Sequence, residues 1–318
     1  MTICLRRREF IAGLGGATAW PLAAGAQQRA LPVIGYSSGR TADSDASMLV
    51  SFRRGLGDVG YAEGRNVVIE YRFADGRYDR LSAQLADLTQ RKAGVIVLAG
   101  FSVGSDDLLR QQIRASPIPI IYNGDPVLAG LVASLNRPGG NVTGVSSLVG
   151  ALSGKQLGLL HDLVPKAATI AALFDRRGNV RGPSPALRDT RDATVALGQK
   201  LLVLEAGTAD EIDAQFASLD REPADAMLVA TSPLFVSRAG QIAALAARRR
   251  IPAIYPRREF ADAGGLISYG YSIAEAYRGM GRYAGRLLNG EKPADLPVFQ
   301  PTTFELVLNL KAAKATRE

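Results

Sequence analysis

Short apolar runs alternate with longer amphipathic stretches along most of this chain. Runs that are apolar throughout are typical of strands buried on both faces, and each one here ends in a polar or glycine-containing loop. The amphipathic stretches carry apolar residues at helical spacing, and the stretch 45–59, for example, stops at Gly60. The expected strands of the first half lie at 33–36, 67–71, 94–99, 118–122 and 142–145.

The same alternation repeats after residue 147. The expected strands of this second set lie at 169–174, 200–204, 226–230 and 252–255, with helices before and between them. Two successive sets predict an α/β fold with two lobes, each a mostly parallel sheet with helices on both faces. Right-handed crossovers place the polar strand-end loops of each set along one edge of its sheet, where ligands of open parallel sheets bind.

The C-terminal part departs from this alternation. The segment 265–271 precedes a long expected helix, 273–288, then a proline-containing connector and a last strand, 304–310. These pieces would make the second lobe much larger than the first, so we expect a return to the first lobe near Tyr269 and another crossing near Pro301. The predicted lobes are 31–146 plus 269–298 and 147–268 plus 299–318. Lobes joined by several crossings form a hinge, with a ligand cleft between facing strand ends.

Residues 1–26 have the pattern of an export signal. Arg7-Arg8-Glu9-Phe10 fits the twin-arginine type, a weakly apolar stretch follows, and Ala24-Gly25-Ala26 forms a small-x-small cleavage site. An amphipathic helix is the alternative, and the apolar part is too short to span a bilayer. We expect a periplasmic protein that has lost this signal and, with it, Cys4, the only cysteine.

Composition excludes several functional classes. A content of 47% hydrophobic residues is globular and sufficient for two lobes. One histidine and no cysteine after removal of the signal cannot supply a zinc site, and phosphate-binding motifs are absent, so no metal and no cofactor are expected. The net charge is +8, but the densest basic runs, 248–250 and 257–258, lack interleaved aromatic residues. We interpret the first as a solvated helix end and expect no nucleic-acid partner.

One motif favours an enzyme. Gly100-Phe101-Ser102-Val103-Gly104 matches the G-x-S-x-G nucleophile elbow and stands after an expected strand and before an expected helix. The base of a triad would have to be His161, the one histidine, but His161 lies in a helical pattern, whereas triad histidines usually come from loops. A periplasmic hydrolase using Ser102 and His161 is therefore the alternative, and the preferred expectation is a protein that is not an enzyme.

Small hydroxyl and glycine residues recur at the expected strand ends in both halves. At helix N-termini such residues leave backbone N–H groups free for a carboxylate or another anion, although a single serine is more often an ordinary helix cap. Ser38 and Ser102 are expected to donate to a ligand, Asp125 to hold a cationic or donor group, and aromatic side chains to enclose the apolar part. The predicted ligand-binding residues are Ser37, Ser38, Phe101, Ser102, Asn123, Asp125, Ser146, Thr231, Ser232, Tyr255 and Tyr269.

Several long motifs occur in the order typical of one family. They are Phe52-Arg53-Arg54-Gly55-Leu56, Gly60-Tyr61-Ala62-Glu63-Gly64-Arg65-Asn66-Val67, Arg137-Pro138-Gly139-Gly140-Asn141-Val142-Thr143-Gly144 and Gly264-Gly265-Leu266-Ile267-Ser268-Tyr269-Gly270. Nearly all of the chain after the signal resembles the periplasmic substrate-binding proteins of ABC transporters, in the branch that includes tryptophan- and tyrosine-binding members.

The resemblance implies a type I periplasmic-binding fold with three crossovers, in which hinge closure traps a small-molecule ligand. It also implies an ABC permease and its ATPase at the inner membrane as partners. Members similar to this chain often carry Gly-Gly-Thr-Pro where Ala99-Gly100-Phe101-Ser102 stands here, and the loop 175–185 is unusually rich in Arg, Gly and Pro. An aromatic amino acid is therefore not carried over as the ligand.

The preferred hypothesis is an exported solute-binding component of an ABC importer. It would capture a small organic solute, such as an amino acid or an aromatic carboxylate, between the lobes. A subunit that senses a ligand and signals to another partner is a further alternative, because its fold would be the same.

Overall fold

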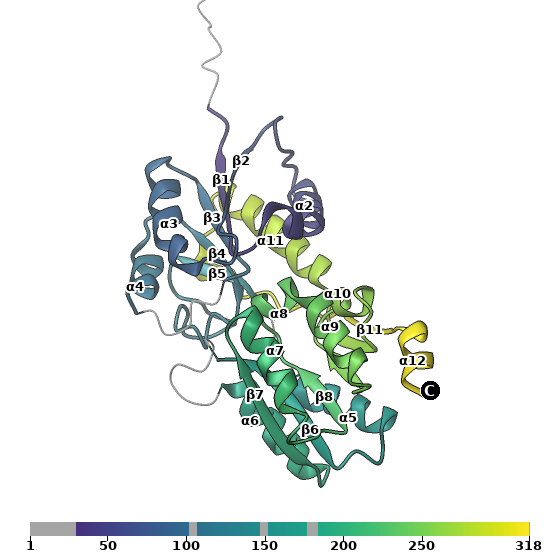
Figure 1. Ribbon diagram of the computed structural model, residues 1–318. Coiled ribbons are helices and arrows are strands. Elements are labelled where there is room, and N and C mark those ends of the chain that lie inside the picture. Colours follow the sequence, from purple (N-terminus) through teal and green to yellow (C-terminus); the bar gives the residue numbers. More distant parts are fainter. Residues whose placement is uncertain (1–29, 102–106, 147–151, 177–183, 318) are drawn as a thin grey trace, which may run out of the picture. The chain divides into compact units, whose positions relative to one another are not determined.

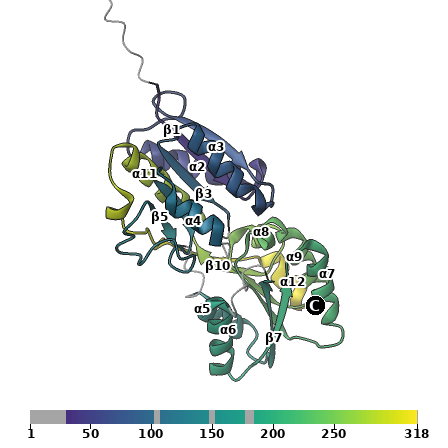
Figure 2. The ribbon, with the colours of Figure 1, turned by 90° about the vertical axis from the view of Figure 1, so that its left-hand side faces the viewer.

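The computed structural model describes residues 30–101, 107–146, 152–176 and 184–317, which form two sheets (Figures 1 and 2). The first sheet is parallel throughout, with the strand order β2-β1-β3-β4-β5. Its strands are β1 (Val33–Ser38), β2 (Val68–Phe73), β3 (Val95–Ala99), β4 (Ile120–Gly124) and β5 (Val142–Ser146).

Helices cover both faces of the first sheet. On one face, Val95 and Val97 of β3 pack with α2 (Ala42–Gly57) and α11 (Ile273–Leu288). On the other, Ile96 and Leu98 pack with α3 (Leu81–Gln90) and α4 (Asp107–Ala115). Alternate residues of one strand thus enter opposite cores, which is why the run is apolar throughout. Two 3-10 turns, η1 (Tyr78–Arg80) and η3 (Pro293–Asp295), complete the described elements of this lobe.

The second sheet has the order β11-β10-β9-β8-β6-β7, and only the pairing of β11 with β10 is antiparallel. Its strands are β6 (Thr169–Asp175), β7 (Lys200–Ala206), β8 (Ala226–Val229), β9 (Ala253–Tyr255), β10 (Ile267–Tyr271) and β11 (Phe304–Leu308). The antiparallel strand lies at an edge, and it is the strand that arrives after the last crossing between the lobes.

The second sheet is also covered on both faces. One core contains residues of α7 (Ala209–Ser218), α8 (Pro233–Ser237), α9 (Ala239–Arg248) and α10 (Arg258–Asp262). The other contains residues of α5 (Ser153–Leu163), α6 (Pro185–Ala196) and α12 (Leu310–Arg317). Within the described part of the chain, no helix combines the length and the apolar character that crossing a membrane requires.

The predicted fold class is confirmed: the protein has two α/β lobes, and the chain passes between them three times. The crossings lie between β5 and α5, between β10 and α11, and between Phe299 and β11. Because β10 pairs in the second sheet as far as Tyr271, the return to the first lobe comes slightly later than the expected position near Tyr269. Phe299 still belongs beside the first sheet, since its N–H donates to the Gly144 carbonyl at 2.8 Å.

The returning helix α11 packs against α2 at very short range, and the two helices lie side by side in both views (Figures 1 and 2). Glycines permit this approach. A Cβ atom at Gly55 would lie 1.9 Å from the Arg278 carbonyl oxygen, and one at Gly281 would lie 2.1 Å from the Phe52 carbonyl oxygen. The close packing of α11 on α2 therefore depends on two residues without side chains, one in each helix.

Candidate functional site

The two serines at the end of β1 are fully buried at the carboxyl edge of the first sheet. The Ser37 hydroxyl donates to Gln84 Oε1 at 2.6 Å, and Ser38 Oγ accepts from the backbone N–H of Arg40 at 3.2 Å. The Ser37 hydroxyl is thus bound to α3 (Leu81–Gln90), and only the Ser38 hydroxyl holds the loop that follows the strand. What this loop presents at the edge is Arg40.

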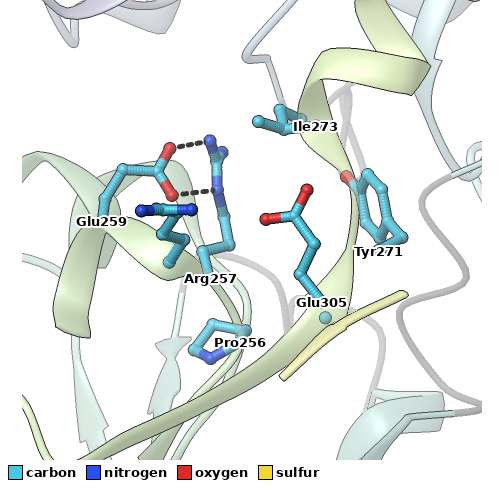
Figure 3. A pocket seen from close by; sticks show the side chains of 8 residues that line it. Pro256, Arg257, Glu259, Tyr271, Ile273 and Glu305 are labelled. Atoms are coloured by element: carbon cyan, nitrogen blue, oxygen red, sulfur yellow. Dashed lines mark hydrogen bonds and ion pairs between the residues drawn. The ribbon is translucent and has the colours of Figure 1, made fainter. Parts of the chain in front are cut away.

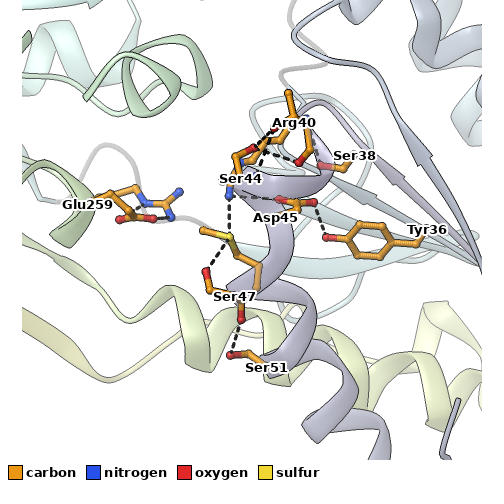
Figure 4. Close-up of polar contacts among 11 residues, drawn as sticks. Tyr36, Ser38, Arg40, Ser44, Asp45, Ser47, Ser51 and Glu259 are labelled. Carbon is orange, nitrogen blue, oxygen red and sulfur yellow. Dashed lines mark hydrogen bonds and ion pairs between the residues drawn. The ribbon is translucent and has the colours of Figure 1, made fainter. Parts of the chain in front are cut away.

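Arg40 has unused binding capacity. Its side chain is only 10% exposed. Its Nη1 lies 3.4 Å from Asp45 Oδ1, which is a long contact, and 3.2 Å from the sulfur of Met48, a weak acceptor (Figure 4). Its Nε is buried and has no hydrogen-bond partner among the described residues. Because a guanidinium has five N–H donors, Arg40 keeps donors available for an anion such as a carboxylate.

Asp45 holds Arg40 from the first turn of α2. Its carboxylate is fully buried, and Oδ2 accepts a hydrogen bond of 2.9 Å from the Tyr36 hydroxyl. Tyr277 of α11 belongs to the same cluster: burial raises the pKa of its phenol to about 12, and its hydroxyl has no partner among the described residues. Burial alone would lower the pKa of Arg40, but the neighbouring phenols, Asp45 and Glu259 raise it overall. The guanidinium is therefore charged, buried and loosely paired.

Three further predicted residues lie along the same edge. Phe101 is buried in the core shared with α3 and α4, and its carbonyl accepts from the Tyr122 hydroxyl at 3.4 Å. Asn123, at the end of β4, is buried, and its Nδ2 has no partner among the described residues. The backbone N–H of Ser146, at the end of β5, donates to the Phe299 carbonyl at 2.9 Å. Of the three side chains, Asn123 has the clearest free donor.

Asp125, which was expected to hold a cationic or donor group of the ligand, stands at the start of a turn. The chain forms turns over residues 126–130. Asp125 Oδ1 accepts from the backbone N–H groups of Val127 and Leu128, at 3.2 and 2.9 Å. One of its carboxylate oxygens is thus already engaged in holding this turn.

In the second lobe, two predicted residues follow β8. The side chain of Thr231 is half-buried and makes no hydrogen bond with the described residues. Ser232 caps α8 by accepting from the Leu234 N–H at 3.1 Å, and its hydroxyl donates to Asp175 Oδ2 at 2.7 Å. Ser232 is therefore an ordinary helix N-cap, as a single serine at a helix start usually is. The Thr231 hydroxyl has no partner among the described residues.

The two predicted aromatic residues of the second lobe pack against their own sheet. Tyr255 is 1% exposed and stacks on Phe260, with ring centroids 4.9 Å apart, inside the hydrophobic core. Tyr269 is half-buried and stacks on Phe304 at 5.9 Å in the core that includes α12. In this structure Tyr255 has almost no surface to offer a ligand, because an aromatic ring at the end of a strand fills the core there.

A small pocket opens beside the end of β10 (Figure 3). Its volume of about 20 Å³ has room for one water-sized group. The guanidinium of Arg257 is 7% exposed and is paired with Glu259, with Nε 3.2 Å from Oε2 and a second contact through Nη2. Glu305, from β11, points its carboxylate into the pocket and makes no hydrogen bond or ion pair with the described residues.

Tyr271 connects this pocket with Arg40. Burial raises the pKa of its phenol, which therefore stays neutral at physiological pH. The phenol interacts electrostatically with Arg257 and Glu259 of the second lobe and also with Arg40 of the first. Tyr271, the last residue of β10, therefore lies where the chain leaves the second sheet for α11 and is near enough to Arg40 for the two to interact electrostatically.

Sequence reasoning missed Arg40, Arg257, Glu259 and Glu305. Arg40 could have been found, because it stands one residue beyond the Ser37-Ser38-Gly39 loop at a strand end. Arg257 and Glu259 follow the expected strand 252–255 and Arg257 belongs to the basic run 257–258, but neither was selected as a site residue. Glu305 carried no local signal, since it is separated by more than forty residues from the loop that it faces.

The residues of the hydrolase alternative are not both described. Ser102 lies outside the described residues. His161 lies in α5, half-buried, with Nδ1 unpartnered among the described residues. Within the described segments, no group of three or more potential metal ligands is close enough to hold an ion.

Comparison with known proteins identifies the family. A family model described as ABC transporter substrate binding protein matches residues 41–317. Over 269 residues the chain is 28% identical to the tyrosine-binding protein of Clostridioides difficile (strain R20291), and the match covers 83% of this chain and 74% of that protein. Sequence similarity thus extends over most of both lobes.

Solved structures support the fold. An ABC domain from Streptococcus pneumonia in complex with L-Trp matches with a TM-score of 0.78 at 21% identity, covering 90% of this chain and 95% of that one. The ligand-free, open structure of a substrate-binding protein with adhesive properties from Clostridium difficile matches with a TM-score of 0.66 at 24% identity, again covering 90% and 95%. The two-lobed arrangement is shared with both.

These findings confirm the resemblance derived from the motifs. They also confirm that the protein is not an enzyme, because the family consists of proteins that bind a substrate without converting it. The match to the family model begins at Thr41, the residue after Arg40, and ends in the last helix, so it covers both lobes. The chain therefore belongs to the family of ABC transporter substrate-binding proteins.

Proposed function

We propose that this protein is the exported solute-binding component of an ABC importer and that it captures a small organic solute carrying a carboxylate between its two lobes. Family membership supports the transport role. The N-terminal pattern supports export to the periplasm, where the lobes would close on the solute and present it to a permease and its ATPase.

The observation that carries the ligand class is the state of Arg40. It is a charged, nearly buried guanidinium at the carboxyl edge of the first sheet. Its Nε has no hydrogen-bond partner in the described part of the chain, and its contact to Asp45 is long. A carboxylate fits the planar fork of a guanidinium with two parallel hydrogen bonds. The Nδ2 of Asn123, at the same edge, has no partner within the described segments and can donate to the same or a neighbouring oxygen.

A thermal-shift screen tests the ligand class. The panel contains small carboxylates, amino acids, amines and neutral polyols at equal concentration. A ligand that binds only the folded protein raises its melting temperature, so carboxylate-bearing members are expected to give the shifts. Stabilisation by polyols or amines alone would contradict the proposed ligand class, and stabilisation by no member would contradict the proposed function.

Arg40 variants test the residue. Charge-assisted hydrogen bonds contribute about 1.5–3 kcal/mol each, so Arg40→Met is expected to weaken binding of the best carboxylate about 10- to 150-fold by calorimetry. Arg40→Lys keeps the charge that Asp45 needs but loses the fork, and should give a smaller loss. Arg54→Met, an exposed arginine on the same helix as Asp45, is the matched control and should bind like the wild type. If Arg40→Met and Arg54→Met bind the carboxylate equally well, Arg40 does not contact the ligand.

The export step has its own test. Replacing Arg7 and Arg8 together by lysine is expected to leave a full-length precursor in the cytoplasm, because the twin-arginine pair is what the export machinery recognises. Cell fractionation followed by mass spectrometry of the N-terminus provides the measurement, and Arg6→Lys is the control. Periplasmic mature protein from the double-lysine variant would show that the leader is of another type.

A further inference from the structure

We propose that Glu305 is a specificity-determining residue of this site: it selects solutes that place an ammonium or another cationic N–H donor in the pocket beside β10. The inference rests on the proposed function and deepens it. It assigns to Glu305 the role that the sequence pattern gave to Asp125, whose Oδ1 is engaged by two backbone N–H groups.

Glu305 lies on β11, the edge strand of the second sheet. β11 runs antiparallel to β10, and Glu305 stands opposite Gly270 in the register. Its side chain is half-buried and points into the pocket toward the space between Arg257 and Tyr271 (Figure 3). Tyr271 and Ile273, which line the pocket, flank the crossing of the chain from β10 to α11. The pocket therefore lies beside one of the segments that join the two lobes, where a solute bound between the lobes would be held.

Two arginines and two glutamates line the pocket. Arg257 faces the same space, but Glu259 already occupies its guanidinium with two contacts. Arg258 contacts Asp262 at 3.4 Å. Tyr271 is held neutral by burial, and Ile273 is apolar. Among the described residues that line the pocket, Glu305 is thus a negative charge whose counter-charge is not supplied by the protein.

A ligand group that fills the pocket displaces water from the Glu305 carboxylate. With about 20 Å³ available, one group of the size of a water molecule or an ammonium fits and removes water from the carboxylate. A carboxylate that loses water without gaining a partner is strongly disfavoured, and a second anion beside it is worse. An ammonium supplies three donors and the opposite charge, whereas a hydroxyl supplies one donor. We therefore expect affinity to be highest for solutes that place a cationic group in the pocket, lower for a neutral donor and lowest for an anion.

The experiment uses pairs of solutes that differ only in the amine. Each L-amino acid in the panel is compared with its deaminated acid, for example L-tyrosine with 3-(4-hydroxyphenyl)propionate. Binding to the wild-type protein is measured by thermal shift and then by calorimetry. We expect the amine-bearing member of the best pair to bind at least tenfold more tightly.

Glu305→Gln is the decisive variant, because it keeps the shape of the side chain and removes the charge. It should fold normally, since Glu305 has no hydrogen-bond or ion-pair partner among the described residues. The preference for the amine should fall to within about threefold. The deaminated acid should bind the variant as well as or better than it binds the wild type. Glu222→Gln, an exposed carboxylate of the same lobe that pairs with Lys200, is the control and should keep the full preference.

The outcomes separate this inference from the function on which it rests. An unchanged preference in Glu305→Gln, or a wild-type protein that binds the deaminated acid as tightly as its amine-bearing partner, overturns the role of Glu305 while Arg40-dependent carboxylate binding persists. If the wild-type protein binds no carboxylate of either kind, both the inference and the proposed function are overturned.

Discussion

Gly281→Ala is expected to destabilise the first lobe by about 3 kcal/mol, at the upper end of what one added methyl group costs in a packed contact. The added Cβ would lie 2.1 Å from the Phe52 carbonyl oxygen and 2.8 Å from the backbone nitrogen of Leu56. Both are backbone atoms of α2, so no flexible side chain can move away. The helices α2 and α11 would have to separate, which loosens the core they share with the first sheet.

Urea unfolding followed by far-UV circular dichroism measures this effect. Gly158→Ala is the matched control, because Gly158 lies inside α5 and a Cβ there would meet nothing within 4 Å. Alanine is a better helix former than glycine by about 1 kcal/mol, so the control should be slightly more stable than the wild type. If Gly281→Ala gains stability as the control does, the close approach of α11 to α2 is not tight in solution.

Asp45→Asn is expected to cost about 3 kcal/mol of unfolding free energy, because it leaves the nearly buried charge of Arg40 without its carboxylate. The substitution keeps the size of the side chain, and the amide oxygen can still accept from the Tyr36 hydroxyl. The loss therefore reports the charge and not a cavity. The same variant should weaken binding of a carboxylate, since Asp45 also orients the guanidinium.

The double variant Arg40→Met/Asp45→Asn tests the reason for this loss. With both charges gone, stability should return to within about 1.5 kcal/mol of the wild type, because an apolar side chain of similar volume is tolerated where a single unpaired charge is not. Chemical unfolding of the wild type, both single variants and the double variant gives the coupling energy. A double variant no more stable than Asp45→Asn would show that the 3.4 Å contact is not the source of the effect.

Much of the architecture follows from local sequence patterns. A run such as 94–99 is apolar at every position because alternate residues enter opposite cores, and this requirement is visible without knowing the partners. The helices between such runs then impose parallel strands and place the strand-end loops at one edge. For this reason the fold class and the order of the elements were predictable.

Contacts between distant segments were decided by the tertiary structure. The segment 267–271 has the same local pattern whichever sheet it joins, and it joins the second because β9 and β11 offer its two edges. Tyr255 looks like a residue of a binding cleft when only its place at a strand end is known. Whether its ring faces a ligand or the core depends on Phe260, which stacks on it.

Sequence by itself therefore determined the two sets of strands and helices, their parallel order and the polar character of the loops where a solute is expected. Only the tertiary structure brought Asp45 and Tyr277 around Arg40, and Glu305 opposite Arg257. The physical reason is that burial and charge pairing depend on which segments meet in space. Which segments meet is decided by packing across the whole chain, so it cannot be read from the residues next to a single position.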